Sequence, residues 1–158
     1  MSRRKARDIT FKYIYSTLYG EGEVSDVLES IITADADEIS NLEGEEKSYF
    51  DKVTNGIKEK EQQIDDMILS KLKNWTIERI FKIDLAILRL AVFEIMYYEN
   101  MPPKVAVNEA VELAKKYGND ASSNFVNGVL REIIKDKENK ICYRFQIIEP
   151  WCTISLSC

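Results

Sequence analysis

The chain has 158 residues, of which 45% are apolar and 31% are charged, a composition typical of one globular domain with a hydrophobic core. It contains no histidine, which removes the most frequent general base, the most frequent metal ligand and every catalytic triad built on histidine. No apolar run reaches the roughly 18 residues of a membrane-spanning helix, and no apolar stretch follows the basic N-terminus, so we expect a cytoplasmic protein without a signal peptide.

The net charge of −5 is unevenly distributed along the chain. Residues 21–66 hold 15 acidic and 4 basic side chains, whereas residues 1–12 hold 5 basic side chains and 1 acidic one. A small basic region on an acidic body indicates directed binding of an anion rather than general adhesion to polyanions.

The first predicted helix begins near Ser2 and runs to about Tyr19, where Gly20 ends it. Four apolar residues at helical spacing form its core face: Phe11, Ile14, Tyr15 and Leu18. Arg4 and Arg7 extend that face toward the N-terminus, and an unpaired charge is costly in a core. We therefore expect the first turns to overhang the packed body and to present arginines, the alternative being an ordinary solvated basic start.

The next predicted elements are a short helix over residues 25–32, capped by Ser25, and an acidic loop over residues 33–44. A long helix then spans about residues 45–75, with Gly56 weakening its middle. Its charged face is most simply a solvated one: Lys58, Glu59, Lys60, Glu61, Asp65 and Asp66.

After a short helical turn at residues 76–81, the stretch from Asp84 to Tyr98 carries apolar side chains in nearly every direction around a helix. A helix that is apolar on all sides is buried, and about 15 residues are too few to span a bilayer. We therefore predict the central helix of a helical domain. Arg89 and Glu94 interrupt its apolar surface and are interpreted as structural, either paired or reaching the rim.

Residues 100–103 break the chain at two prolines, and an amphipathic helix follows over residues 104–117. Its predicted inward residues are Val105, Val107, Ala110, Val111 and Ala114. A last helix starts at Asp120 or Ser122 and carries Phe125, Val126, Val129, Leu130, Ile133 and Ile134 inward. From about Glu138 the helical period is lost, and residues 138–158 are either a mobile tail or an apolar strip that packs or aggregates.

No pattern in the chain predicts catalysis, a metal site or a cofactor. There is no glycine-rich phosphate loop, no nucleophile elbow and no H-E-x-x-H sequence. All three cysteines fall in the C-terminal tail, at a spacing that matches no zinc motif: Cys142, Cys152 and Cys158. Phe125 is either a core residue or an exposed ring on which an RNA base stacks.

Four sequence motifs carry a resemblance to a known family. They are R-R-K-A-R at residues 3–7, I-D-L-A-I-L-R-L-A-V-F-E at residues 83–94, P-P-K-V-A-V-N-E-A-V-E-L-A-K-K-Y-G at residues 102–118 and F-V-N-G-V-L at residues 125–130. In this order and spacing, residues 3–135 resemble the NusB family of bacterial transcription antitermination factors.

The resemblance implies an all-α fold, a compact bundle of about seven helices arranged as two three-helix subdomains. These subdomains would cover about residues 1–75 and 76–137, followed by the atypical tail. The resemblance also implies a non-enzymatic role in which the protein binds boxA RNA, a single-stranded leader element of ribosomal RNA operons. Binding is joint with NusE, a small-subunit ribosomal protein, and the complex loads on RNA polymerase to suppress premature termination.

Site residues are carried over by position. The expected RNA-binding residues are Arg3, Arg4, Lys5, Arg7, Lys12, Asn124 and Phe125. The expected NusE-facing residues are Asp84, Arg89, Pro103, Asn108 and Glu109. Within the second set, we expect Asp84 and Arg89 to emerge at a partner-facing rim of the central helix, whereas Glu94 has a structural role.

Two other interpretations stay open at this point. The chain resembles the RNA-binding domain attached to ribosomal RNA cytosine methyltransferases, although no catalytic domain follows it here. It could also act as a helical oligomerisation module, because some family members form homodimers that bury the RNA-binding face. The sequence leaves open whether the protein is a monomer or a homodimer.

Overall fold

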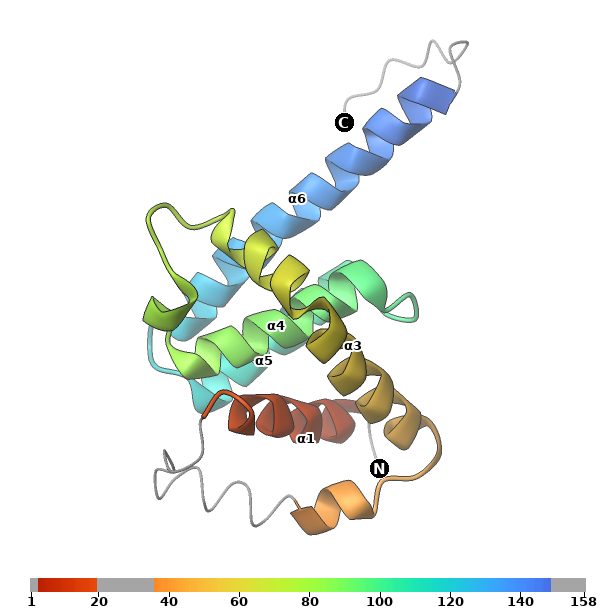
Figure 1. Cartoon of the computed structure of the whole chain (residues 1–158), viewed down its shortest axis with the longest axis vertical. Helices are drawn as coiled ribbons and strands as arrows, with labels where there is room; N and C mark the ends of the chain where they lie inside the picture. Colours follow the sequence, from red (N-terminus) through yellow and green to blue (C-terminus); the bar gives the residue numbers. More distant parts are fainter. Residues whose placement is uncertain (1–2, 20–35, 149–158) are drawn as a thin grey trace.

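The computed structural model describes residues 3–19 and 36–148, with the backbone alone for residues 141–148, and these ranges are helical with short connections (Figure 1). The elements are α1 (Arg3–Ser16), α3 (Gly44–Leu69), the 3-10 helix η1 (Ile77–Arg79), α4 (Lys82–Tyr97), α5 (Pro103–Tyr117) and α6 (Ser122–Ile148). The predicted all-α class is confirmed. The short helix predicted over residues 25–32 lies outside the described residues.

The central position predicted for α4 is confirmed. Every residue from Asp84 to Ile95 is buried, and α4 packs against α1, α3, α5 and α6 (Figure 1). An almost wholly apolar surface can only be satisfied when neighbours cover each side of the helix. α4 is therefore the element around which the other helices are arranged.

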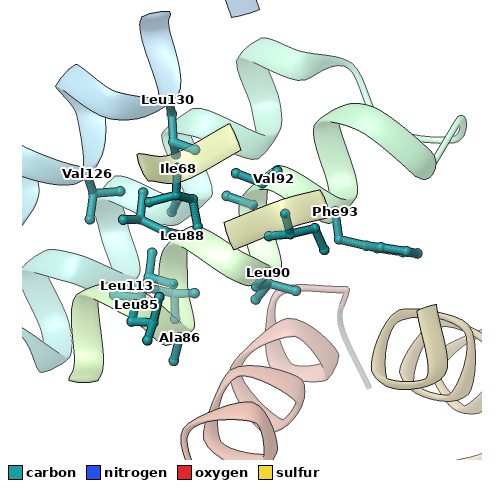
Figure 2. Packing of buried hydrophobic residues seen from close by; sticks show 14 of the residues in the cluster. Ile68, Leu85, Ala86, Leu88, Leu90, Val92, Phe93, Leu113, Val126 and Leu130 are labelled. Carbon is teal, nitrogen blue, oxygen red and sulfur yellow. The ribbon is translucent and has the colours of Figure 1, made fainter. Parts of the chain in front are cut away.

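One hydrophobic cluster joins all five long helices. Figure 2 shows part of it, with Ile68 from α3, Leu88 from α4 and Leu130 from α6 gathered in one region. A second and smaller cluster, made of Ile9, Leu42 and Phe50, ties α1 to the segment before α3 and to α3 itself. Because α4 shares the main cluster with every neighbour, the division into two subdomains stays a prediction.

Gly56 lies at a close approach between α3 and α4. A Cβ atom built on this glycine would lie 2.3 Å from Cε2 of Phe93, far inside van der Waals contact. The glycine therefore allows the Phe93 ring to pack against the α3 backbone, which explains a residue that helix propensity alone disfavours.

α3 is shorter than predicted, and the acidic loop before it is partly helical. The helix ends at Leu69, and the turn that follows includes Asn74 with φ 60°, a left-handed conformation that asparagine adopts more readily than most residues. Residues 36–40 are helical rather than part of an open loop. Ile39 in this stretch packs on the smaller cluster, and this contact stabilises a helix that the sequence pattern does not indicate.

α6 is longer than predicted, because the helix continues through the first part of the expected tail to Ile148. Figure 1 shows this C-terminal half, in blue, extending away from the other helices. Elongating an existing helix adds one hydrogen bond for each residue fixed, and lysine and glutamate favour the helical state. The loss of apolar periodicity after Glu138 therefore does not mark the end of the helix. Residues 149–158 lie outside the described residues.

The inward face of α5 differs from the predicted one at Val105. This side chain is 43% exposed, whereas Ala106 and Leu113 are buried. Val107, Ala110 and Ala114 are buried as predicted. Within the described ranges, no helix combines the length and the apolar character needed to cross a membrane.

Candidate nucleic-acid interface

α1 and α5 lie side by side and form a groove lined by charged side chains of both signs. The cations on its walls are Arg4, Lys5, Arg7, Lys12 and Lys116, and the anions are Asp8, Glu38, Glu109 and Glu112. Four of the predicted RNA-binding residues therefore share one groove. Lys116 was missed from the sequence, although it lies in the last turn of a predicted amphipathic helix.

Arg4 is exposed and forms a bidentate ion pair with Glu109 of α5. Its Nη2 lies 3.1 Å from Oε1 and its Nε lies 3.3 Å from Oε2 of that carboxylate. The hydrogen bonds and the charge of Glu109 raise the pKa of Arg4. The structure thus joins a residue predicted to bind RNA to one predicted to face NusE.

Arg7 is buried, so the prediction that the first turns overhang the body is wrong at this residue, whereas Arg3 and Arg4 are exposed as expected. Its Nε and Nη2 donate to the two carboxylate oxygens of Glu94 at 3.0 and 2.9 Å, and the hydroxyl of Tyr49 donates to the same carboxylate at 3.0 Å. Ala6 and Ile9 are also buried. A charge at the start of α1 can lie in the core because α4 supplies the partner.

The ionisation of this buried pair follows from its geometry. Burial lowers the pKa of Arg7, but the hydrogen bonds and charge of Glu94 outweigh that effect and raise it. Burial raises the pKa of Glu94 above its ordinary value, while the hydrogen bonds from Arg7 and Tyr49 oppose the rise. Because three donors face one carboxylate, we treat the pair as ionised at neutral pH. The structural role predicted for Glu94 is consistent with this arrangement.

Asp8 organises the far part of the groove. Its Oδ1 accepts hydrogen bonds from the Tyr117 hydroxyl at 2.6 Å and from Lys116 Nζ at 3.0 Å, and Lys12 Nζ lies 3.4 Å from Oδ2. Burial acts to raise the pKa of Asp8, but the hydrogen bonds from Tyr117 and Lys116 lower it overall. This cluster fixes the positions of Lys12 and Lys116 along the groove.

Asn124 and Phe125 lie at the start of α6. Asn124 is exposed and Phe125 is half-buried, packed against the main core on one side. The Phe125 ring also packs on Trp75, with 6.1 Å between ring centroids and 33° between ring planes. Trp75 is 44% exposed and was not singled out from the sequence. Phe125 therefore fits both interpretations of the sequence in part, because its ring contacts the core and is also partly accessible.

The basic residues lie along α1 and α5, whereas Phe125 lies at the start of α6 and packs on Trp75. Glu109, which holds Arg4, and Tyr117, at the end of α5, are eight residues or about 12 Å apart along the helix axis. Asn124 and Phe125 follow Tyr117 in the chain, at the end of α5 away from Arg4 (Figure 1). The predicted RNA residues are therefore divided between α1 and the start of α6 instead of being gathered at one point.

We expected Arg89 to emerge at a rim, but it is buried between α4 and α3. Its Nε and Nη2 pair with the two carboxylate oxygens of Asp65 at 2.9 and 2.8 Å, and Nη2 lies 3.2 Å from Glu61. The solvated face predicted for α3 is therefore wrong at Asp65. Asp84 is also buried; burial raises the pKa of its carboxyl, and a hydrogen bond from Ser122 opposes that rise.

The remaining residues predicted to face NusE lie on α5. Asn108 is exposed, Pro103 begins the helix and is half-buried, and the Glu109 side chain is 19% exposed. These three residues share the N-terminal half of α5. In the described part of the chain, no group of three or more metal-ligating side chains could hold a metal ion.

Comparison with known proteins identifies the family. The model of the NusB family matches residues 4–135. The transcription antitermination protein NusB of Clostridium novyi (strain NT) is 43% identical over 135 residues, which cover 85% of this chain and 99% of the relative. The chain belongs to the NusB family. It is thereby placed among transcription antitermination proteins, a regulatory class and not a class of enzymes.

Solved structures agree with this assignment. T. maritima NusB matches with a TM-score of 0.72 and 34% identity, over 85% of this chain and 92% of that one. A structure of the antitermination factors NusB and NusE in complex with dsRNA matches with a TM-score of 0.68 and 27% identity, over 85% of this chain and 96% of that one. The all-α arrangement described above is therefore that of the NusB family.

Proposed function

We propose that this NusB-family protein binds boxA RNA of ribosomal RNA operons jointly with ribosomal protein NusE, and that the complex acts on RNA polymerase in the cytoplasm. One observation carries the proposal: Arg4, Lys5, Lys12 and Lys116 line a single groove between α1 and α5. A related NusB has been crystallised with NusE and dsRNA, which supports NusE and an RNA as partners for this chain.

In this proposal the basic residues of α1 contact RNA phosphates, and the ring of Phe125 contacts a base. Arg3, Arg4 and Lys5 are exposed on α1 and supply charge along the RNA backbone. Phe125 offers a partly accessible ring for stacking, and the exposed amide of Asn124 offers polar contacts to a base edge.

Arg7 has a different role in this proposal from the one that the family pattern implies. Its side chain is 6% exposed, and its guanidinium is held by Glu94 and Glu109. We therefore infer that Arg7 fixes the start of α1 against α4, so that Arg3, Arg4 and Lys5 are presented from a rigid helix. It acts as a positioning residue rather than as a phosphate contact.

The proposed NusE surface is the exposed N-terminal half of α5, with Pro103, Asn108 and Glu109. A basic ribosomal protein is complementary to the acidic body of this chain, whose net charge is −5. Asp84 and Arg89, which are buried, would influence this surface only by holding α4 in place.

The test is a titration of single-stranded boxA RNA with and without NusE at several salt concentrations. We expect Arg3→Ala together with Arg4→Ala to weaken binding and to reduce the salt dependence of log K by about 0.7 per lost phosphate contact. The matched control replaces Lys135 and Lys140 by alanine, which removes two exposed cations of α6 outside the groove. Equal affinity and equal salt dependence in both double variants would contradict the proposed site.

A further inference from the structure

The ion pair between Arg4 and Glu109 joins two sites that the family pattern assigns separately. Arg4 belongs to the proposed RNA site, and Glu109 belongs to the proposed NusE surface. Their contact is bidentate, with distances of 3.1 and 3.3 Å, and connects residues 105 positions apart in the chain. A change in the environment of one residue therefore acts directly on the other.

Glu109 occupies the same donors that an RNA phosphate would use. The guanidinium fork of arginine pairs equally well with a carboxylate and with a phosphate, through two parallel N–H···O bonds. In this structure Nε and Nη2 of Arg4 both point at Glu109. A phosphate must therefore displace Glu109, or accept Arg4 through its remaining donors.

We propose that Glu109 competes with RNA phosphate for Arg4, and that a basic partner which engages Glu109 releases Arg4 and so tightens RNA binding. The inference rests on the proposed function, to which it adds a route of coupling between the RNA and the protein partner. Because coupling between two binding sites is reciprocal, RNA bound to Arg4 also frees Glu109 for the partner.

The surrounding structure allows this exchange without loss of the fold. Arg7, whose Nη1 lies 3.5 Å from Glu109, keeps its bidentate pair with Glu94 when Glu109 is removed. α5 is also held by its buried apolar residues, among them Ala106 and Ala110. Glu109 is therefore free to change partners while α1 and α5 stay packed.

The experiment compares single-stranded boxA RNA binding by the full-length wild type, Glu109→Gln, Arg4→Ala and the double variant, each with and without NusE. Without NusE, we expect Glu109→Gln to bind RNA about two- to fivefold more tightly than the wild type, in the range of an exposed ion pair. On the Arg4→Ala background the same change has no effect. The factor by which NusE strengthens RNA binding falls in Glu109→Gln by the same two- to fivefold.

The matched control is Glu112→Gln. Glu112 lies in the same groove and on the same helix, but it pairs with Lys115 of α5 instead of with α1. An equal gain in RNA affinity for Glu112→Gln would show an effect of net charge and would overturn the inference. An unchanged or weaker affinity for Glu109→Gln, with an unchanged melting temperature, would also overturn it.

A second variant guards against a local effect of the glutamine amide, which can still accept one hydrogen bond from Arg4. Glu109→Ala removes both acceptor oxygens, and we expect the same gain in affinity. The outcome also separates the inference from the proposed function. If the wild type binds no RNA even with NusE, the proposed function fails and the inference with it; if it binds RNA but Glu109→Gln does not differ, only the coupling fails.

Discussion

Two carboxylates on consecutive helices determine whether an N-terminal arginine is buried or exposed. Glu94 on α4 forms an ion pair with Arg7 in the core, and Glu109 on α5 forms one with Arg4 at the surface. The same residue type, three positions apart on one helix, therefore serves packing in one case and remains available for binding in the other. The difference comes from the partner helix that each guanidinium meets.

The buried pair gives a sharp prediction about stability. Glu94→Gln leaves the Arg7 charge buried with only the more distant Glu109 to balance it, and we expect a loss of about 3 kcal/mol or more in the free energy of unfolding. Urea denaturation monitored by circular dichroism measures this change. As a control, Glu132→Gln removes an exposed carboxylate of α6 and should change stability by no more than about 0.5 kcal/mol. Equal, small effects of the two changes would contradict the structural role of Glu94.

At the scale of the elements, the α3–α4 contact is closely fitted. Gly56 lets the Phe93 ring lie against the α3 backbone, and the ion pair of Arg89 with Asp65 closes the same interface. A glycine in the middle of a helix and an arginine in an apolar helix are both unfavourable locally. Each is explained by the other helix, which supplies the ring in one case and the carboxylate in the other.

Two glycines in helices test this explanation. Gly56→Ala places a Cβ atom against a buried ring, and we expect a loss of about 1–3 kcal/mol of stability despite the better helix propensity of alanine. Gly128→Ala in α6 meets no atom within 4 Å, and we expect a gain of about 0.5–1 kcal/mol. Thermal unfolding of both variants measures the contrast. A stabilised Gly56→Ala protein would show that the ring moves aside at little cost.

At the scale of the whole molecule, the described core contacts of α6 lie in its N-terminal half. Ile133 is the last buried residue of α6 in the main cluster; beyond it, Asp136 pairs with Lys71 and Lys137 donates to the carbonyl of Ile95. The family model likewise ends at residue 135. The C-terminal half of α6 therefore extends beyond the bundle that carries the proposed site (Figure 1).

A truncation tests this separation of bundle and extension. We expect a chain ending at Lys140 to keep its free energy of unfolding within about 0.5–1 kcal/mol and to keep its RNA affinity, because the removed residues follow every described core contact. A chain ending at Gly128 lacks Val129, Leu130 and Ile133, and we expect it to be unfolded. Circular dichroism measures the stability of both truncated chains, and the RNA titration measures their affinity. A shorter chain that lost several kcal/mol on removal of residues 141–158 would show that this segment packs on the bundle.

The elements themselves were largely predictable from the sequence. Apolar residues around nearly the whole surface of residues 84–95 could only mean a buried helix. Pro102 and Pro103 at the start of α5 and Gly118 after its end marked the bounds of that helix. These signals are local, since they depend on residues within a few turns of one another. Where local periodicity was absent, at residues 36–40 and after Glu138, the helical state was missed.

The side-chain pairs that shape the candidate site were decided only by the tertiary structure. Arg7 and Glu94 lie 87 positions apart, Arg4 and Glu109 lie 105 apart, and Arg89 and Asp65 lie 24 apart. No spacing rule connects such residues, because their meeting depends on how α1, α3 and α5 pack around α4. The sequence by itself determined an all-α chain with a buried central helix and a basic start. The packing of the helices decided which arginines are buried, which one faces the groove, and which carboxylate holds it there.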